Sequence, residues 1–314
     1  MVASSTIKST LLKVINKKEI WMHNEALEPK IKLNNDIEIP VLGLGVWKAS
    51  NAEAATAVSM AISHGYVLID TAKQYGNELG VGNGIQDGLK VAGKNRDDLF
   101  ITTKIYSGDQ GYQPSIDAID GQLERLQTDH VDLLLMHWPV NDLYNETWRG
   151  MEQIYHAGKA RAIGVCNFDV ERLTDLLKNA SVTPAINQIE FNPRIHQQAV
   201  VDLCRSKGIQ IEAWSPLGNG KLLELPLLNN IAVAHKKTSA QVILRWEVQS
   251  NVIVIPKSVH EDRIAENADI FDFSLSADEM DQINQLNEEH HSRWYDDYQW
   301  YGNPNGDPNR IMQA

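Results

Sequence analysis

The feature that most constrains the fold is a series of short apolar segments, each of which ends in polar residues or glycine. Eight such segments occupy residues 41–46, 67–70, 99–104, 131–137, 162–167, 185–190, 209–215 and 252–257. Helix-like stretches lie between most of them, at residues 51–64, 114–127, 146–157, 169–180 and 197–207. The repeat is regular, because 34 residues separate Asp70 from Lys104 and 33 separate Lys104 from His137. This alternation predicts parallel strands joined by right-handed crossovers, and eight units predict an α/β fold of the (β/α)8 TIM-barrel type.

The competing fold is a doubly wound sheet, which would carry a G-x-G-x-x-G turn after its first strand. Gly43 and Gly45 stand in the first apolar segment, but no third glycine follows at the required spacing. A phosphate loop is also poorly matched, because residues 88–95 (GLKVAGKN) end in Asn where that motif needs Ser or Thr. The barrel is therefore the favoured interpretation.

Segments outside the repeat set the domain boundaries that we expect. Residues 31–33 and 37–39 alternate apolar and polar positions around Asn34-Asn35-Asp36, which predicts an N-terminal β-hairpin. Residues 1–30 are expected to be a flexible extension, with a transit peptide as the less favoured interpretation. Residues 31–314 are expected to form a single domain with a loop-like insert at 218–230 and an aromatic C-terminal loop at about 288–314. That loop either packs on the barrel exterior or forms a wall of a ligand site.

Charge and composition disfavour several classes of partner. The net charge of -12 would repel nucleic acid and anionic membranes. No apolar run approaches the length of a membrane span, so a cytoplasmic protein without membrane association is expected. Cys166 and Cys204 fit neither a disulfide framework nor a CxxC metal pattern. The histidines and carboxylates form no clustered ligand set, so no metal is expected and a metal-dependent barrel hydrolase is disfavoured.

Four polar residues lie at or just after the ends of three consecutive predicted strands. Asp70 ends one apolar segment and Tyr75 follows it, while Lys104 and His137 end the next two segments. Each has a simple structural interpretation on its own, as a helix cap, a packed aromatic, a solvated strand end or a core histidine. In a barrel, however, all four would meet at the C-terminal rim, where such enzymes carry their active sites.

The chemistry of this set indicates carbonyl reduction. A tyrosine with an ordinary pKa of about 10 is a weak proton donor at neutral pH. The ammonium of Lys104 beside Tyr75 would stabilise the phenolate and lower the pKa of Tyr75, and Asp70 would hold Lys104 charged and in place. His137 could orient the substrate oxygen by a hydrogen bond. Because these residues supply no electrons, a hydride-donating cofactor is implied.

The sequence from about residue 31 to residue 287 resembles the aldo-keto reductase superfamily. The resemblance rests on motifs that read GLGVW, LIDTAKQYGNE, TTK, LLLMHWP, GVCNF, NQIEFNP, WSPLG and IPKSVHEDRIAEN, in family order and with family spacing. It implies a (β/α) barrel that binds NADPH in extended form, reduces a small-molecule carbonyl substrate, and uses Asp70, Tyr75, Lys104 and His137 as its catalytic residues. Small aldehydes and ketones, sugars and dicarbonyls are the substrate classes expected, and a monomer is favoured over a dimer.

The resemblance also implies a set of cofactor contacts, position by position. Asn167 and Gln188 match nicotinamide carboxamide contacts, and Ser215 and Leu217 match contacts near the pyrophosphate. The last motif supplies the residues that match the adenosine 2′-phosphate and adenine contacts: Lys257, Ser258, Arg263, Glu266 and Asn267. Cations at this place favour NADPH over NADH, although a solvated basic face is the alternative interpretation of Lys257 and Arg263.

Two positions depart from the family pattern. Cys166 stands where Ser is common, and a thiol is a weaker hydrogen-bond donor to a carboxamide. Trp214 stands where the nicotinamide-stacking residue is usually Tyr, and an indole keeps the π face. By the same resemblance, the substrate would lie between Trp47, Tyr106 and Trp138. The alternative function is a barrel that binds the nicotinamide cofactor as a sensor or accessory subunit with negligible turnover.

Overall fold

The computed structural model describes residues 29–288. Most of the expected extension at residues 1–30, and the expected aromatic loop beyond residue 288, lie outside the described residues.

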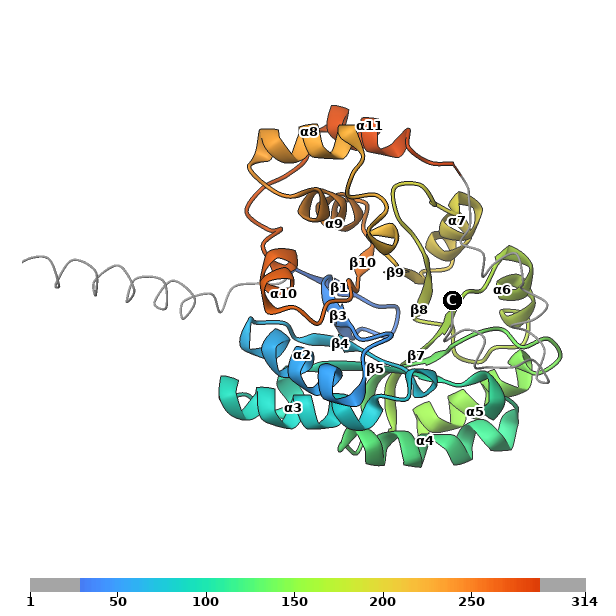
Figure 1. Cartoon of the computed structure of the whole chain (residues 1–314). Helices are drawn as coiled ribbons and strands as arrows, with labels where there is room; N and C mark the ends of the chain where they lie inside the picture. Colours follow the sequence, from blue (N-terminus) through green and yellow to red (C-terminus); the bar gives the residue numbers. More distant parts are fainter. Residues whose placement is uncertain (1–28, 289–314) are drawn as a thin grey trace, which may run out of the picture.

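Eight parallel strands form one sheet in which each strand pairs with its neighbours in chain order (Figure 1). The strands are β3 (Gly43–Gly45), β4 (Leu68–Asp70), β5 (Phe100–Ile105), β6 (Val131–Met136), β7 (Ala160–Cys166), β8 (Ile186–Glu190), β9 (Gln210–Trp214) and β10 (Ile253–Val254). The two edges then meet, because the amide of Val254 donates to the oxygen of Val41 at 2.9 Å and Gly45 donates to Pro256 at 3.2 Å. The expected (β/α)8 barrel is therefore confirmed.

Closure depends on a close backbone approach at Gly45. A Cβ on this residue would lie 2.8 Å from the carbonyl oxygen of Ile255, which directly follows β10, the strand that completes the barrel. Glycine is required here because a side chain would push the last strand away from the first.

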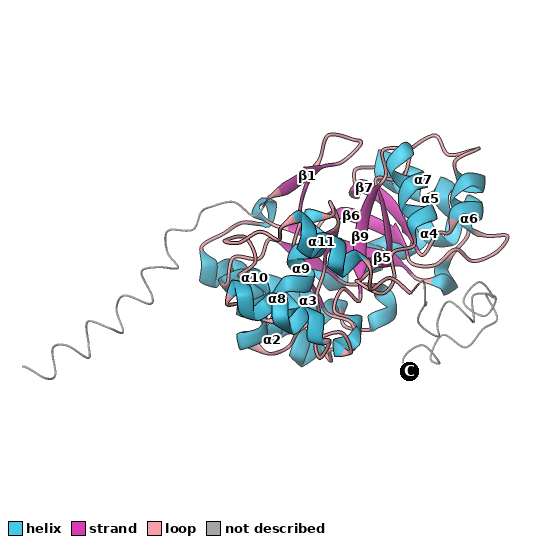
Figure 2. Cartoon of the chain, turned by 90° about the horizontal axis from the view of Figure 1, so that it is seen from above, coloured by secondary structure: helices cyan, strands magenta, loops and turns pink. Residues whose placement is uncertain are grey.

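Helices surround the sheet, as seen from above in Figure 2. They are α2 (Asn51–Ser63), α3 (Glu78–Ala92), α4 (Tyr112–Leu126), α5 (Tyr144–His156), α6 (Val170–Leu176), α7 (Gln198–Ser206), α8 (Pro226–His235), α9 (Ser239–Gln249), α10 (Glu261–Ala268) and α11 (Ala277–Asn284). Capping boxes explain where several of them begin: Ser50 pairs with Glu53 at α2, and Thr238 pairs with Gln241 at α9. The expectation of a loop at 218–230 is wrong in its second half, because Pro226 begins α8 in the first helical turn, where proline is favoured.

The barrel interior has an apolar lower part and a polar upper part. Inward side chains alternate along each strand, and the lower ones form a buried cluster that includes Leu68, Phe100 and Leu133. The expected hairpin, β1 (Lys30–Lys32) and β2 (Glu38–Pro40), adds Leu33 and Ile39 to the same cluster.

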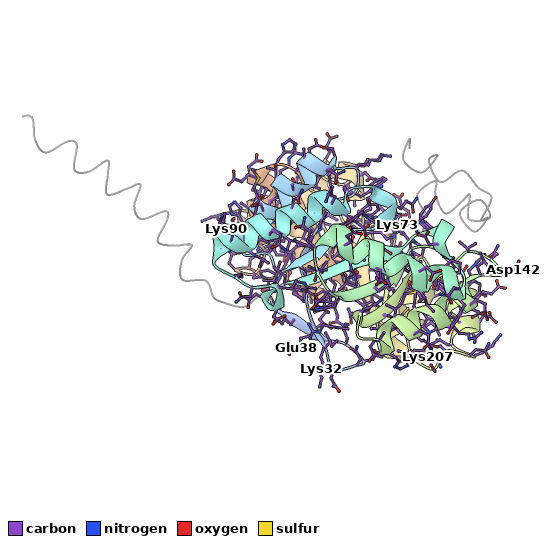
Figure 3. All side chains as sticks on the ribbon, turned by 90° about the horizontal axis from the view of Figure 1, so that it is seen from below. Lys32, Glu38, Lys73, Lys90, Asp142 and Lys207 are labelled. Atoms are coloured by element: carbon purple, nitrogen blue, oxygen red, sulfur yellow. The ribbon has the colours of Figure 1, made fainter. Side chains whose placement is uncertain are left out.

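The hairpin covers the N-terminal end of the barrel. Asn34 donates to the oxygen of Pro184, just before β8, and Asn35 donates to the oxygen of Arg161 at the start of β7. Figure 3 shows Lys32 and Glu38 together on this hairpin. The opposite, C-terminal end therefore remains for the polar residues.

No helix among residues 29–288 is long and apolar enough to cross a membrane.

Candidate functional site

The upper, polar part of the barrel brings together Asp70, Tyr75 and Lys104. The Lys104 ammonium donates to Asp70 Oδ1 at 2.6 Å, to the carbonyl oxygen of Thr71 at 3.0 Å and to the Tyr75 hydroxyl at 3.3 Å. Lys104 is completely buried, and these three acceptors satisfy its three hydrogens. A buried cation is tolerated here because it is both paired and fully hydrogen-bonded.

His137 lies beside this group, directly after β6. Its ring packs edge-on against that of Tyr75, with centroids 5.6 Å apart. Within residues 29–288, the buried Nδ1 of His137 has no hydrogen-bond partner. The structure therefore assembles all four residues that the sequence placed at strand ends.

Burial dominates the electrostatics of these side chains. It raises the pKa of Tyr75 to about 12, although the nearby Lys104 cation acts to lower it. Burial is the largest single influence on Lys104 and acts to lower its pKa, but Asp70, Tyr75 and Cys166 together outweigh it, so the pKa of Lys104 is raised. Burial and the same cation hold the pKa of His137 well below its usual range. Lys104 thus acts on Tyr75 in the expected direction, but the net lowering of the Tyr75 pKa that we expected is not found.

Two amides hold the residues next to these four. Asn167 donates to the backbone oxygen of His137 at 3.1 Å and accepts from the Trp214 indole at 2.8 Å. Asn167 and Ser215, directly after β7 and β9, have left-handed backbones with φ of 62° and 53°. The buried Oγ of Ser215 has no partner within the described part of the chain, and Leu217 follows in the same loop.

Gln188 points into the barrel. Its amide nitrogen donates to Asp70 Oδ2 at 2.9 Å and to Glu212 Oε2 at 2.8 Å. The Cys166 thiol lies 3.8 Å from the other amide atom, Oε1, and burial raises the pKa of this thiol well above its ordinary value. Both N–H groups of the Gln188 amide are therefore used, and its oxygen can still accept a hydrogen bond from a ligand.

The last motif forms the loop after β10 and the first turns of α10. Lys257 and Arg263 are exposed, and neither side chain makes an ion pair within residues 29–288. Ser258 Oγ bonds to the backbone of His260. The side chain of Asn267 is buried.

Glu266 is partly engaged elsewhere, because it accepts from Thr238 at the start of α9 at 2.8 Å. Lys257 and Arg263 are therefore the two cations of this motif that other described residues do not neutralise.

Three aromatic residues lie in the loops around the four central side chains. Trp47, Tyr106 and Trp138 follow β3, β5 and β6, so they share the C-terminal rim. Asn77 fixes the first loop by donating to the oxygens of Val46 and Ala49, both at 2.9 Å. Gln110 fixes the third loop through the oxygen of Trp138.

Several of these contributors were missed at the sequence level. Asn77 and Gln110 act through backbone oxygens, and no spacing pattern reports such contacts. Glu212 could have been found, because it stands two residues before Trp214 in one strand and must share its inward face. Among the described residues, no group of three or more His, Cys, Asp or Glu side chains could hold a metal ion.

Comparisons with known proteins show the family to which the chain belongs. The profile of the Aldo/keto reductase family matches residues 41–288. Glyoxal reductase from Bacillus subtilis (strain 168) is 51% identical over 265 residues, which cover 84% of this chain and 95% of that protein.

Solved structures give the same result. An aldo/keto reductase from Brucella melitensis is 47% identical with a TM-score of 0.79, and the match covers 83% of this chain and 100% of that one. A Bombyx mori aldo-keto reductase in complex with NADP is 36% identical with a TM-score of 0.82, covering 88% and 100%. The chain therefore belongs to the aldo/keto reductase family.

Proposed function

We propose that the protein reduces aldehydes and ketones to alcohols with NADPH, using Tyr75 as the proton donor. The observation that carries this proposal is the contact of the Tyr75 hydroxyl with the Lys104 ammonium, which is itself paired with Asp70. A phenol with a pKa of about 12 gives up a proton only to a strong base, and an alkoxide formed from a carbonyl is one. Lys104 stabilises the phenolate that remains, and Asp70 keeps Lys104 charged.

His137 orients the carbonyl oxygen of the substrate. Its lowered pKa keeps the imidazole neutral at pH 7, so it donates one hydrogen bond without adding a charge. A neutral donor is suited to this role. A second cation beside Lys104 would lower the pKa of Tyr75, so the hydroxyl could lose its proton before the substrate is bound.

The residues present fit a reduced nicotinamide adenine dinucleotide phosphate, which supplies the hydride when it is bound. NADP(H) is the cofactor of the family, as in the relative described with NADP. Asn167 Nδ2 and Gln188 Oε1 would hold the carboxamide, and Trp214 would face the ring. The Ser215 hydroxyl, which has no partner among residues 29–288, would lie along the pyrophosphate together with Leu217.

Lys257 and Arg263, with Ser258, would bind the 2′-phosphate. A dianion requires cations that are not already paired with carboxylates, and these two are not paired within residues 29–288. Asn267 and Glu266 would lie against the adenine. The residues Trp47, Tyr106 and Trp138 would form the substrate walls.

Small dicarbonyls are the substrate class that we favour. The similarity to glyoxal reductase from Bacillus subtilis supports this choice. An α-dicarbonyl also suits the chemistry. Its second carbonyl makes the first more electrophilic, so hydride transfer from NADPH with proton delivery by the protein is sufficient for reduction.

The test is to mix the protein with NADPH and a panel of carbonyls, and to follow the loss of NADPH absorbance. The panel should contain glyoxal, simple aldehydes, a ketose and a steroid ketone. We expect turnover that is fastest with the dicarbonyl. Tight NADPH binding without turnover on any member of the panel would contradict the proposal and favour the sensor or accessory-subunit function.

A further inference from the structure

Glu212 is a buried carboxyl at the centre of the barrel that the proposed chemistry does not use. It lies in β9 between Ile211 and Ala213, which belong to the buried core that the strands share with the surrounding helices, so the side chain of Glu212 points into the barrel. It is fully buried, and within the described residues its Oε1 has no hydrogen-bond partner.

Glu212 contacts the site through Gln188. One amide nitrogen of Gln188 bridges two carboxyl groups, at 2.9 Å from Asp70 and 2.8 Å from Glu212. The atom between them must be the nitrogen, because Asp70 is an ionised partner of Lys104 and can only accept. Both amide hydrogens are therefore used, and the amide oxygen is left facing the Cys166 thiol at 3.8 Å, where the proposed function places the nicotinamide carboxamide.

The charge of Glu212 is constrained by its neighbours. Burial and the Asp70 carboxylate raise the pKa of Glu212 to about 8, while Gln188 and Lys104 act to lower it. The other titratable groups facing this region are Tyr75, whose pKa is about 12, and Cys166, whose pKa is well above its ordinary value. Lys104 stays charged and His137 stays neutral at these pH values. Of these groups, Glu212 is therefore the one whose charge changes just above neutral pH.

We propose that Glu212 is a positioning residue of the site: as a neutral acid it fixes the Gln188 amide against Asp70, and its ionisation weakens proton delivery from Tyr75. The second effect rests on the proposed function. An ionised Glu212 adds a second carboxylate that interacts with Asp70 and Lys104, so it opposes the field of the Lys104 ammonium at Tyr75 and the phenolate left by proton transfer is less stable. Reduction should slow as Glu212 loses its proton.

The first experiment compares pH profiles of carbonyl reduction at saturating NADPH. We expect the wild-type rate to fall about three- to tenfold between about pH 7 and pH 9.5, with an apparent pKa near 8. Glu212→Gln keeps the shape of the side chain but cannot ionise, so this fall should be absent. The matched control is Glu247→Gln, which changes a buried carboxyl in α9 and should keep the wild-type profile. A wild-type profile that is flat through this range, or a fall that persists in Glu212→Gln, would overturn the effect of ionisation.

The second experiment does not depend on turnover. Glu212→Leu removes the acceptor of the Gln188 amide, and we expect the Kd of NADPH, measured by fluorescence, to rise at least about fivefold. Glu212→Gln retains an acceptor and should recover most of this loss. Equal NADPH affinity in the Leu and Gln variants would overturn the positioning role. If the protein reduces no carbonyl, the proposed function fails, but this comparison still decides whether Glu212 positions Gln188.

Discussion

Lys104 shows how a charge is kept inside the barrel. Removal from water acts to lower the pKa of Lys104, yet its three acceptors, of which Asp70 is a carboxylate, keep the ammonium protonated. Burying the ammonium costs desolvation energy, which nearby acceptors must offset. The C-terminal end of the barrel supplies them, because Asp70, Thr71 and Tyr75 all come from one strand and the loop that follows it.

At the same scale, Lys257 tests the assignment of the cofactor. Lys257→Ala should raise the KM for NADPH about tenfold or more, because a charge-assisted bond to a phosphate is worth about 1.5–3 kcal/mol. The KM for NADH should change little, since NADH lacks the 2′-phosphate. Lys90→Ala, at an exposed lysine on α3 (Figure 3), is the control and should change neither value. An equal rise for both cofactors would contradict the 2′-phosphate contact.

How far single residues could be assigned from the sequence depended on how they act. Asp70, Tyr75, Lys104 and His137 were predictable because each ends or follows an apolar run, and the parallel sheet then brings the strand ends together. The net pKa of Tyr75 was not predictable, because it depends on how much loop covers the phenol, and burial outweighs the neighbouring cation. The inward direction of Glu212 was readable, but its contact with Gln188 required the register of β8 and β9.

At the scale of an element, helix α9 contains a buried carboxyl whose loss of hydration is not offset by hydrogen bonds from the described residues. Glu247 is fully buried, and neither of its carboxyl oxygens has a partner among the described residues. Burial raises the pKa of Glu247 well above its ordinary value, so it is neutral in the folded protein where it would be ionised in the unfolded chain. The folded state then binds the extra proton, and its stability must fall as the pH rises above the unfolded pKa of about 4.5.

Glu247→Gln should remove this pH dependence. Relative to wild type, the free energy of unfolding of the variant should increase from pH 5 to pH 8 by at least about 1 kcal/mol, because one unit of pKa shift corresponds to about 1.4 kcal/mol. Urea unfolding of both proteins at the two pH values measures the difference. A constant difference would mean that Glu247 is ionised in the folded state.

Strands and helices were predictable where the apolar pattern was continuous, and the prediction failed where turn residues interrupted it. The eight apolar runs all contain strands, because a buried parallel strand needs a continuous apolar sequence. Helix α8 was missed because its start at Pro226 follows a glycine-rich turn, and the whole stretch resembles a loop. Strand β10 is only Ile253–Val254, since the chain after it leaves the ladder and Lys257 contacts β3 through a single bridge to Gly45.

At the scale of the molecule, the two ends of the barrel have different tasks. The hairpin covers one end with Leu33 and Ile39, and the polar residues occupy the other. Because barrel enzymes carry their active sites at the C-terminal face, changes at the covered N-terminal end should affect stability and leave the chemistry unchanged.

Ile39→Ala tests this separation. Ile39 is fully buried in the inner cluster, so the truncation should cost about 2–5 kcal/mol of unfolding free energy. Well below the unfolding temperature, kcat and the KM for the carbonyl should match those of the wild type. A loss of kcat in a fully folded Ile39→Ala protein would show that the two ends are coupled.

The central claim is that a carbonyl is reduced with a proton from Tyr75. The most direct measurement is the rate of NADPH oxidation by glyoxal with wild-type protein and Tyr75→Phe side by side, together with the NADPH affinity of each. Removing the hydroxyl alone should lower kcat about 100- to 10,000-fold while NADPH affinity is unchanged, as for the loss of a general acid. A Tyr75→Phe protein that keeps more than about a tenth of the wild-type kcat would contradict the account.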